Sequence, residues 1–159
     1  MHLRIAIGAL ASVAAAATLA PVALPARSHD FRATYTGSGA GQLSGTHASG
    51  SATAKGRGNV LGRSTLSGAA AGVLKSPSCL SFDGNAVLKG SAGSIRLDAR
   101  AAQACIPASG SGKVDFSGSA RVTGGTKRFS QASGLLTFHG VYNQQSATVT
   151  ISFTGRVTY

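Results

Sequence analysis

The chain has 159 residues, 22 of them glycine, and its 15 Lys and Arg residues against 4 acidic residues give a formal net charge of +11. This length suffices for one domain with a single hydrophobic core and excludes two domains of ordinary size. The charge favours anionic partners, either acidic polysaccharide or a lipid surface, although a solvated basic surface without a partner is the alternative. The cations are scattered singly apart from Lys55-Gly-Arg57 and Lys127-Arg128, so specific nucleic-acid binding is not predicted.

The N-terminal segment has the pattern of a secretory signal peptide. Residues 1–4 are short and basic, residues 5–20 are almost wholly apolar, and Pro21 and Pro25 interrupt the run before the small residue Ala26. We predict a signal peptide over residues 1–26 and one domain over residues 27–159, in a secreted or periplasmic protein. An uncleaved membrane anchor over residues 5–24 is the alternative.

A short motif, an apolar residue followed by a polar residue and a glycine, recurs along the predicted domain. The flanks of most copies alternate between apolar and polar residues, which is the period of a half-buried β-strand. Eight copies match the number of strands that can close a small barrel. The copies begin at Tyr35, Leu43, Leu66, Phe82, Leu97, Phe116, Phe138 and Phe153, and the copy at Leu97 ends in alanine.

The repeated glycines on the apolar face also bear on the fold. Glycine weakens a strand unless the backbone has to bend sharply, as it does in a small barrel whose interior barely holds side chains. No segment of the predicted domain keeps a helical period, because glycine and β-branched residues recur too often. We therefore predict an all-β fold, a single antiparallel β-barrel of about eight strands, with a β-sandwich as the alternative.

The two cysteines lie at the far ends of one predicted hairpin. Cys79 opens one alternating segment, Cys105 closes the next, and Lys89-Gly-Ser-Ala-Gly93 between them is typical of a turn. In an exported chain this placement predicts a Cys79–Cys105 disulfide, with two free thiols as the alternative. The alternation puts the two cysteines on opposite faces, so we also predict a β-bulge at Ala101 and Ala102.

The segment from Gly124 to Gly134 reads GGTKRFSQASG. It resembles the glycine-rich signature, roughly GGTGxFxxAxG, of the allene oxide cyclase and dirigent-like barrels, and departs from it where Lys127 replaces glycine. The resemblance implies an eight-stranded barrel. It carries over no cyclase or coupling chemistry, because no acidic or cysteine residue here matches one that such chemistry needs. From the residues alone, Gly124 and Gly125 form a tight turn and Phe129 caps one end of the barrel.

The last segment alternates up to a terminal aromatic residue, through Ile151, Phe153, Gly155, Val157 and Tyr159. This pattern is similar to the last strand of bacterial outer-membrane barrels, in which the apolar face meets lipid. A small outer-membrane β-barrel is therefore one alternative function class. The absence of Trp, the few aromatic residues for two girdles and the predicted disulfide count against it.

Candidate chemical groups are sparse. Asp83, Asp98, Asp115 and His139 fall on the polar face by alternation, and His47 is the one histidine that the pattern could turn inward. No metal-ligand spacing, cofactor motif or catalytic constellation is present, so we predict no metal, no cofactor and no catalytic residues. A cyclase-like or isomerase-like enzyme is kept as an alternative, requiring His47 and a Tyr or acid to meet inside the barrel.

The predicted activity is therefore non-enzymatic: either binding of a small apolar ligand inside the barrel or association with the anionic cell envelope. Small residues on the apolar face could leave a void among the aromatic ones. The candidate interior ligand contacts are Tyr35, His47, Phe82, Phe116, Phe138, Tyr142 and Phe153.

Overall fold

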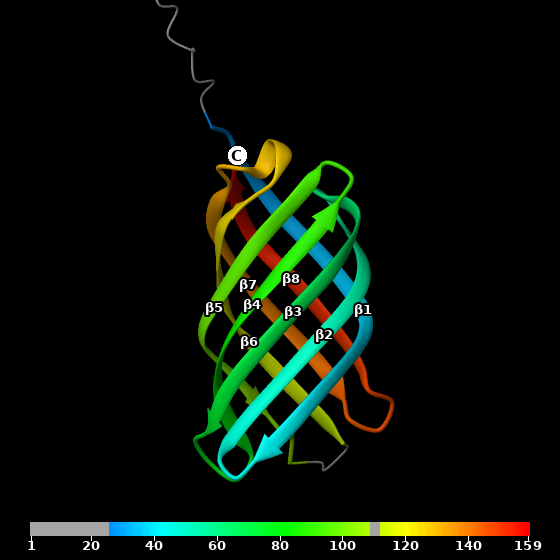
Figure 1. Ribbon diagram of the computed structural model, residues 1–159, viewed down its shortest axis with the longest axis vertical. Coiled ribbons are helices and arrows are strands. Elements are labelled where there is room, and N and C mark those ends of the chain that lie inside the picture. The colour runs from blue at the N-terminus through cyan, green and yellow to red at the C-terminus, as the bar shows by residue number, and fades with distance from the viewer. Residues whose placement is uncertain (1–25, 109–111) are drawn as a thin grey trace, which may run out of the picture.

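The computed structural model describes residues 26–108 and 112–159, so the predicted signal peptide lies outside the described residues except for Ala26. Eight antiparallel strands follow one another around a closed barrel in chain order, with β8 paired to β1 (Figure 1). The prediction of an all-β, eight-stranded barrel is confirmed, and the β-sandwich alternative is wrong. The strands are β1 (Ser28–Ser44), β2 (His47–Gly58), β3 (Gly62–Leu74), β4 (Cys79–Gly90), β5 (Gly93–Cys105), β6 (Lys113–Gly125), β7 (Ser133–Asn143) and β8 (Thr148–Thr158), and a short 3-10 helix, η1 (Lys127–Phe129), precedes β7.

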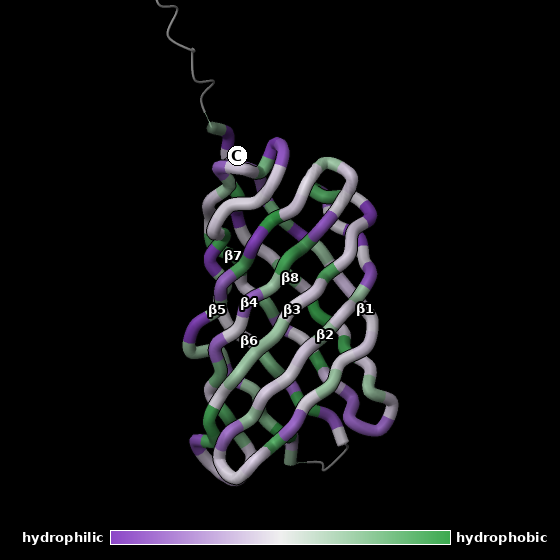
Figure 2. Tube along the Cα trace, viewed as in Figure 1, coloured by the Kyte–Doolittle hydropathy of each residue, from purple (hydrophilic) through white to green (hydrophobic). Residues whose placement is uncertain are grey.

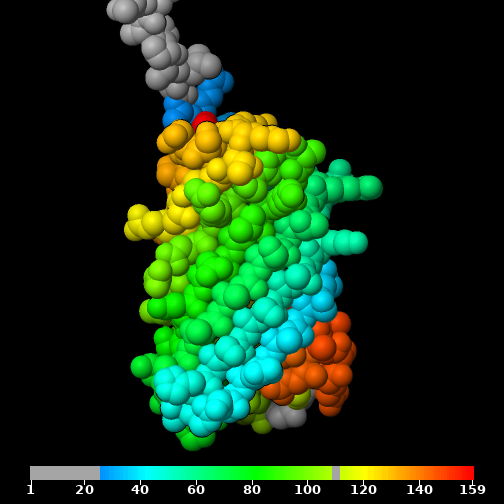
Figure 3. Space-filling view, viewed as in Figure 1, coloured from blue at the N-terminus to red at the C-terminus, as the bar shows by residue number. Residues whose placement is uncertain are grey.

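The two ends of the elongated barrel differ (Figures 1 and 3). At the end drawn uppermost, η1 and Tyr159 lie over the barrel, and we call this the closed end. The opposite end carries the β1–β2, β3–β4 and β7–β8 turns, and we call it the open end. Across residues 26–108 and 112–159, no helix is long and apolar enough to cross a membrane.

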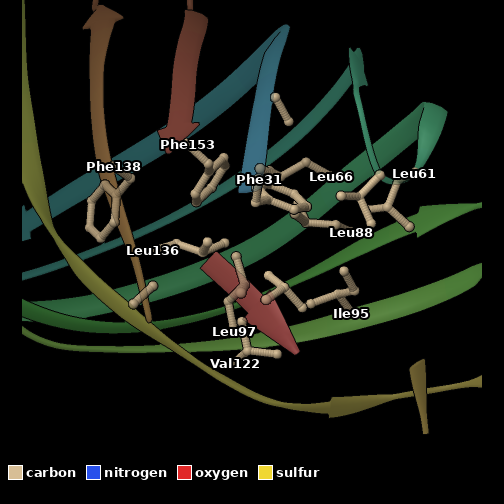
Figure 4. Packing of buried hydrophobic residues seen from close by; sticks show 14 of the residues in the cluster. Phe31, Leu61, Leu66, Leu88, Ile95, Leu97, Val122, Leu136, Phe138 and Phe153 are labelled. Carbon is tan, nitrogen blue, oxygen red and sulfur yellow. The ribbon is translucent and has the colours of Figure 1, made fainter. Parts of the chain in front are cut away.

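The closed half of the barrel holds a packed core (Figure 4). Alternate residues of each strand point inward, and full burial of one large apolar side chain contributes about 1.5–3 kcal/mol. The outward positions are largely polar, as the alternating colours along several strands show (Figure 2). The largest fully buried side chains are those of Tyr35, Phe31, Phe129, Leu88, Ile95, Leu136 and Val157.

The direction of the last strand bears on the outer-membrane alternative. That alternative required the apolar face of β8 to point outward, against lipid. In the structure Phe153 is 3% exposed and Val157 is fully buried, and both belong to the central core cluster. The apolar face of β8 therefore points into the barrel, which is the opposite direction.

The eight motif copies are not distributed one to a strand. β1 carries two of them, at Tyr35 and Leu43, whereas β2 carries none. Leu43 lies at the open end and is 61% exposed, and its motif runs from the last two residues of β1 into the β1–β2 turn. The agreement between eight copies and eight strands is thus partly a coincidence, although the other strands each hold one copy.

Several glycines make room for an aromatic ring on the neighbouring strand. A Cβ placed on Gly140 would lie 2.4 Å from Cζ of Phe116, and one placed on Gly56 would lie 2.7 Å from Cδ1 of Tyr35. Both pairs are direct cross-strand neighbours. Coverage of a glycine by an aromatic neighbour is a known means of stabilising a curved sheet. The glycines therefore permit close packing as well as curvature.

The predicted disulfide is confirmed, and the predicted bulge is present one residue earlier, at Arg100 and Ala101 instead of Ala101 and Ala102. Cys79 and Cys105 are paired in register across β4 and β5 and form a disulfide. The register shifts opposite Asp83, where Ala101 adopts a φ of +51°. Beyond this bulge Ala102 and Ala104 are buried, so the bulge restores the phase of the two cysteines.

The glycine-rich segment closes one end of the barrel. The side chain of Phe129 in η1 is fully buried in the core cluster, which confirms that it caps that end. Lys127, the residue that departs from the glycine-rich signature, has a φ of +54°, in the left-handed region that favours glycine. Arg128 lies over the rings of Phe129 and Tyr159, with its Cζ 4.8 and 5.3 Å from the two ring centroids.

Candidate functional site

A cavity of about 580 Å³ occupies the open half of the barrel. Two exposed apolar residues at the open end, Leu43 and Ile106, belong to its lining, so the cavity extends to that end. Its floor is formed by Leu66, Leu97 and Phe153, which are also members of the packed core. The interior of the barrel is therefore divided into a filled half and a hollow half.

The hollow half has two unlike walls. The wall contributed by β1, β2 and β3 consists of inward-facing glycine and alanine, including Gly50, Ala52 and Ala70. No bulky side chain reaches inward from β2, because its inward positions from Ala48 to Gly58 are occupied by alanine and glycine alone. The cavity exists because this wall carries almost no side-chain volume.

The facing wall is aromatic. Phe138 lies at its centre, with ring centroids 6.4 Å from Phe82, 6.4 Å from Phe116 and 6.1 Å from Phe153. These separations are typical of tilted and edge-to-face aromatic pairs. Within this wall the ring of Phe116 packs closely against Gly140 on the neighbouring strand. A rigid apolar surface therefore faces the glycine and alanine wall.

The structure brings together five of the seven residues predicted as interior ligand contacts. Tyr35 is inside the barrel but fully buried in the packed core, where it does not line the cavity. His47 is exposed on the outer surface, because the Gly45-Thr46 turn pairs it with the outward-facing Ser44. The expectation that His47 points inward is therefore wrong. The five residues that line the cavity are Phe82, Phe116, Phe138, Tyr142 and Phe153.

Polar groups at the cavity are few. The hydroxyl of Tyr142 donates a 3.4 Å hydrogen bond to the carbonyl oxygen of Gly39, and Gln42 and Gln144 lie in the lining near the turns of the open end. No Asp, Glu, His, Lys or Arg occurs among the described lining residues. In the described ranges, no group of three His, Cys, Asp or Glu side chains could hold a metal ion. The site is suited to apolar contact.

Two titratable groups outside the cavity have shifted pKa values that matter for stability. Burial raises the pKa of Tyr35, and a 2.9 Å hydrogen bond to the hydroxyl of Ser64 opposes this shift. On the outer surface, a backbone hydrogen bond from Ala101 lowers the pKa of Asp83, and Arg100 adds to the effect. Neither group lines the cavity.

Sequence reasoning missed the glycine and alanine wall as part of the site. Its signal was present in the residues between His47 and Gly58, which alternate strongly but include no large apolar residue. In a barrel, one such strand beside two others of small residues predicts a void.

No protein-family model, curated protein or solved structure matches this chain.

Proposed function

We propose that this protein binds a small apolar ligand in the cavity of its open half. The observation that supports the proposal is the cavity itself, whose volume of about 580 Å³ is within the range of roughly 300–1,000 Å³ typical of small-molecule sites. Apolar walls offer water few hydrogen-bond partners, so apolar cavities stay dry or bind apolar molecules. A ligand between the two walls would make van der Waals contacts that the small side chains of the glycine and alanine wall do not make.

The shape and polarity of the cavity restrict the ligand class. The described walls offer no charged partner, so an ionised group would lose its hydration without compensation on entering. We propose a ligand with an apolar body that lies against Phe116 and Phe138, and with any polar group at the open end beside Gln42 or Gln144. Aromatic contacts with Phe138 would suit a flat or ringed body.

A cavity-filling substitution tests the proposal. Ala70 faces inward between Gly50 and Gly84, whereas Ser67 on the same strand is exposed on the outer surface and does not line the cavity. We expect wild-type protein to bind a neutral apolar fluorophore such as N-phenyl-1-naphthylamine saturably, and Ala70→Phe to weaken that binding at least about tenfold. The control variant Ser67→Phe, on the outer surface of the same strand, should bind as the wild type does. Absence of saturable binding to wild type, or equal binding by both variants, would overturn the proposal.

We further propose that the protein acts outside the cytoplasm. The Cys79–Cys105 disulfide supports this location, because disulfides persist mainly in oxidising compartments. The cyclase-like alternative stays a prediction that no geometric observation favours. It required His47 to meet a Tyr or an acid inside the barrel, and His47 is on the outer surface.

A further inference from the structure

We propose that the outer surface of β1 to β4 near the closed end binds a linear acidic polysaccharide. The surface, which we call the basic face, is defined by five exposed cations: Arg32, Lys55, Arg57, Arg63 and Lys89. Long side chains project sideways from the β2 and β3 part of the barrel, near the closed end (Figure 3). This proposal is independent of the cavity, which lies inside the other half of the molecule.

Strand pairing gathers cations that are separate in the sequence. Arg57 on β2 is the direct cross-strand partner of Arg63 on β3. One step along the strands on the same face, Thr65 pairs with Lys55 on one side and with Lys89 on the other. Neighbouring strands lie about 5 Å apart, and outward residues along a strand about 7 Å apart. The basic face therefore presents cations at repeated short intervals.

The charge of the basic face is not neutralised by the protein. The ion pairs among the described residues link Arg100 to Asp83 and Asp98, and Arg156 to Asp30. None of them includes a cation of the basic face. Like charges directly opposite one another in a sheet are destabilising, so the Arg57 and Arg63 pair carries a cost in the free protein. An anionic ligand would remove that cost by placing a negative group between them.

The groups beside the cations suit a sugar polymer. A shallow surface hollow is lined by Arg32, Thr34, Arg57 and Asn59, and Asn59 fixes its edge by bonding to the backbone of Arg32 and Asp30. Arginine binds carboxylate and sulfate groups with two parallel hydrogen bonds. Threonine hydroxyls can both donate to and accept from sugar hydroxyls.

The composition of the basic face argues against two other polyanions. The large hydrophobic residues exposed in the described ranges are Leu43, Val73, Ile106 and Leu135, and none lies on the basic face. A lipid surface would therefore find no apolar residue there to insert. The five cations also have no aromatic residue exposed among them, so single-stranded nucleic acid would find no stacking platform.

Lys127 and Arg128, which are adjacent in the sequence, are less available to bind an anionic ligand. Nζ of Lys127 donates to the carbonyl oxygen of Ser91, and Nη2 of Arg128 donates to that of Val60. Arg128 also lies over two aromatic rings. These contacts hold both side chains in the cap of the closed end, so the pair is not included in the proposed surface.

Two double variants with the same change in net charge test the proposal. Arg57→Gln with Arg63→Gln removes two charges from the basic face, and Lys75→Gln with Lys113→Gln removes two near the open end. On immobilised heparin, we expect the control pair to need nearly the wild-type salt concentration for elution. The basic-face pair should elute at clearly lower salt and bind about tenfold more weakly at low ionic strength.

Equal shifts for the two double variants would overturn the proposal, because retention would then depend on net charge alone. Thermal unfolding controls for damage to the fold, and the basic-face pair should melt at or above the wild-type temperature, since it removes a repulsion. Sedimentation with vesicles of anionic phospholipid tests whether the protein binds a lipid surface instead. If wild-type protein sediments with vesicles but is not retained on heparin, the polysaccharide assignment is wrong.

Discussion

Oδ1 of Asp83 on β4 accepts a 2.8 Å hydrogen bond from the backbone N–H of Ala101, the bulged residue of β5. The same carboxylate contacts Arg100, whose guanidinium also binds Asp98. Because the bulge restores the phase of the two strands beyond it, this contact holds the register in which Cys79 meets Cys105. A single surface carboxylate thus supports the covalent link of the hairpin.

Replacing Asp83 by alanine should lower the melting temperature, because the N–H of Ala101 loses its acceptor. The pKa of Asp83 is lowered in the folded state, so its contribution is present above the unfolded value of about 3.8 and is lost as pH falls through the lower folded value. Thermal melts between pH 7 and 3 should show this loss in wild type and not in Asp83→Asn. Equal acid sensitivity of the two proteins would contradict the assignment.

Removal of the disulfide should cost a large part of the stability. The two cysteines are 26 residues apart, and a loop of that length corresponds to about 3–4 kcal/mol in the chain-entropy model. We expect Cys79→Ser with Cys105→Ser to lower the urea midpoint accordingly and to match the wild type treated with dithiothreitol. A reductant effect on the double variant would indicate some other target.

The contribution of the buried Tyr35 and Ser64 hydroxyl pair to stability should depend on pH in the alkaline range. Tyr35→Phe removes the 2.9 Å hydrogen bond to Ser64 and should cost about 0.5–1.5 kcal/mol near neutral pH. The pKa of Tyr35 is raised in the folded state, so its contribution is complete below the unfolded value of 10.0 and declines as pH rises through the higher folded value. The urea midpoint of the wild type should therefore exceed that of Tyr35→Phe at pH 8, and the difference between the two midpoints should shrink above pH 10. Tyr142→Phe, which loses a longer bond, is the matched control.

Two glycine-to-alanine substitutions should have opposite effects. A Cβ on Gly140 would overlap Phe116, so Gly140→Ala should destabilise by roughly 1–3 kcal/mol. A Cβ on Gly41 would find no atom nearer than 3.8 Å, so Gly41→Ala should be neutral or stabilise by up to about 1 kcal/mol. Chemical unfolding of both variants measures the difference. Equal destabilisation would mean that glycine is needed for strand curvature alone.

Much of the fold could be predicted because alternation and cysteine spacing are local signals. The outward position of Asp83 and the bulge near Ala101 follow from counting residues along strands, and the capping role of Phe129 follows from the glycine-rich segment that precedes it. The number of strands was predicted on weaker grounds, since β1 carries two motif copies and β2 carries none. His47 was placed wrongly for a related reason: a two-residue turn reversed the chain just before it.

The site could be predicted only in part, because a cavity and a charged face depend on register between strands. The aromatic residues and the small residues of β2 are both visible in the sequence, but which of them face each other depends on how the strands pair and close. Likewise Arg57 and Arg63 are six positions apart and become partners only through the turn between β2 and β3. Pairings of this kind are properties of the folded sheet.

The division of the interior has a consequence for how this protein could change over time. Residues such as Phe31, Leu88 and Ile95 hold the closed half together without touching the cavity. Substitution of an alanine on the small-residue wall, such as Ala70, could therefore reshape the hollow half without changing the packed core, whereas a side chain at Gly72 would overlap the backbone of Ser81. A barrel built in this way can change which ligands it binds while its packed core stays the same.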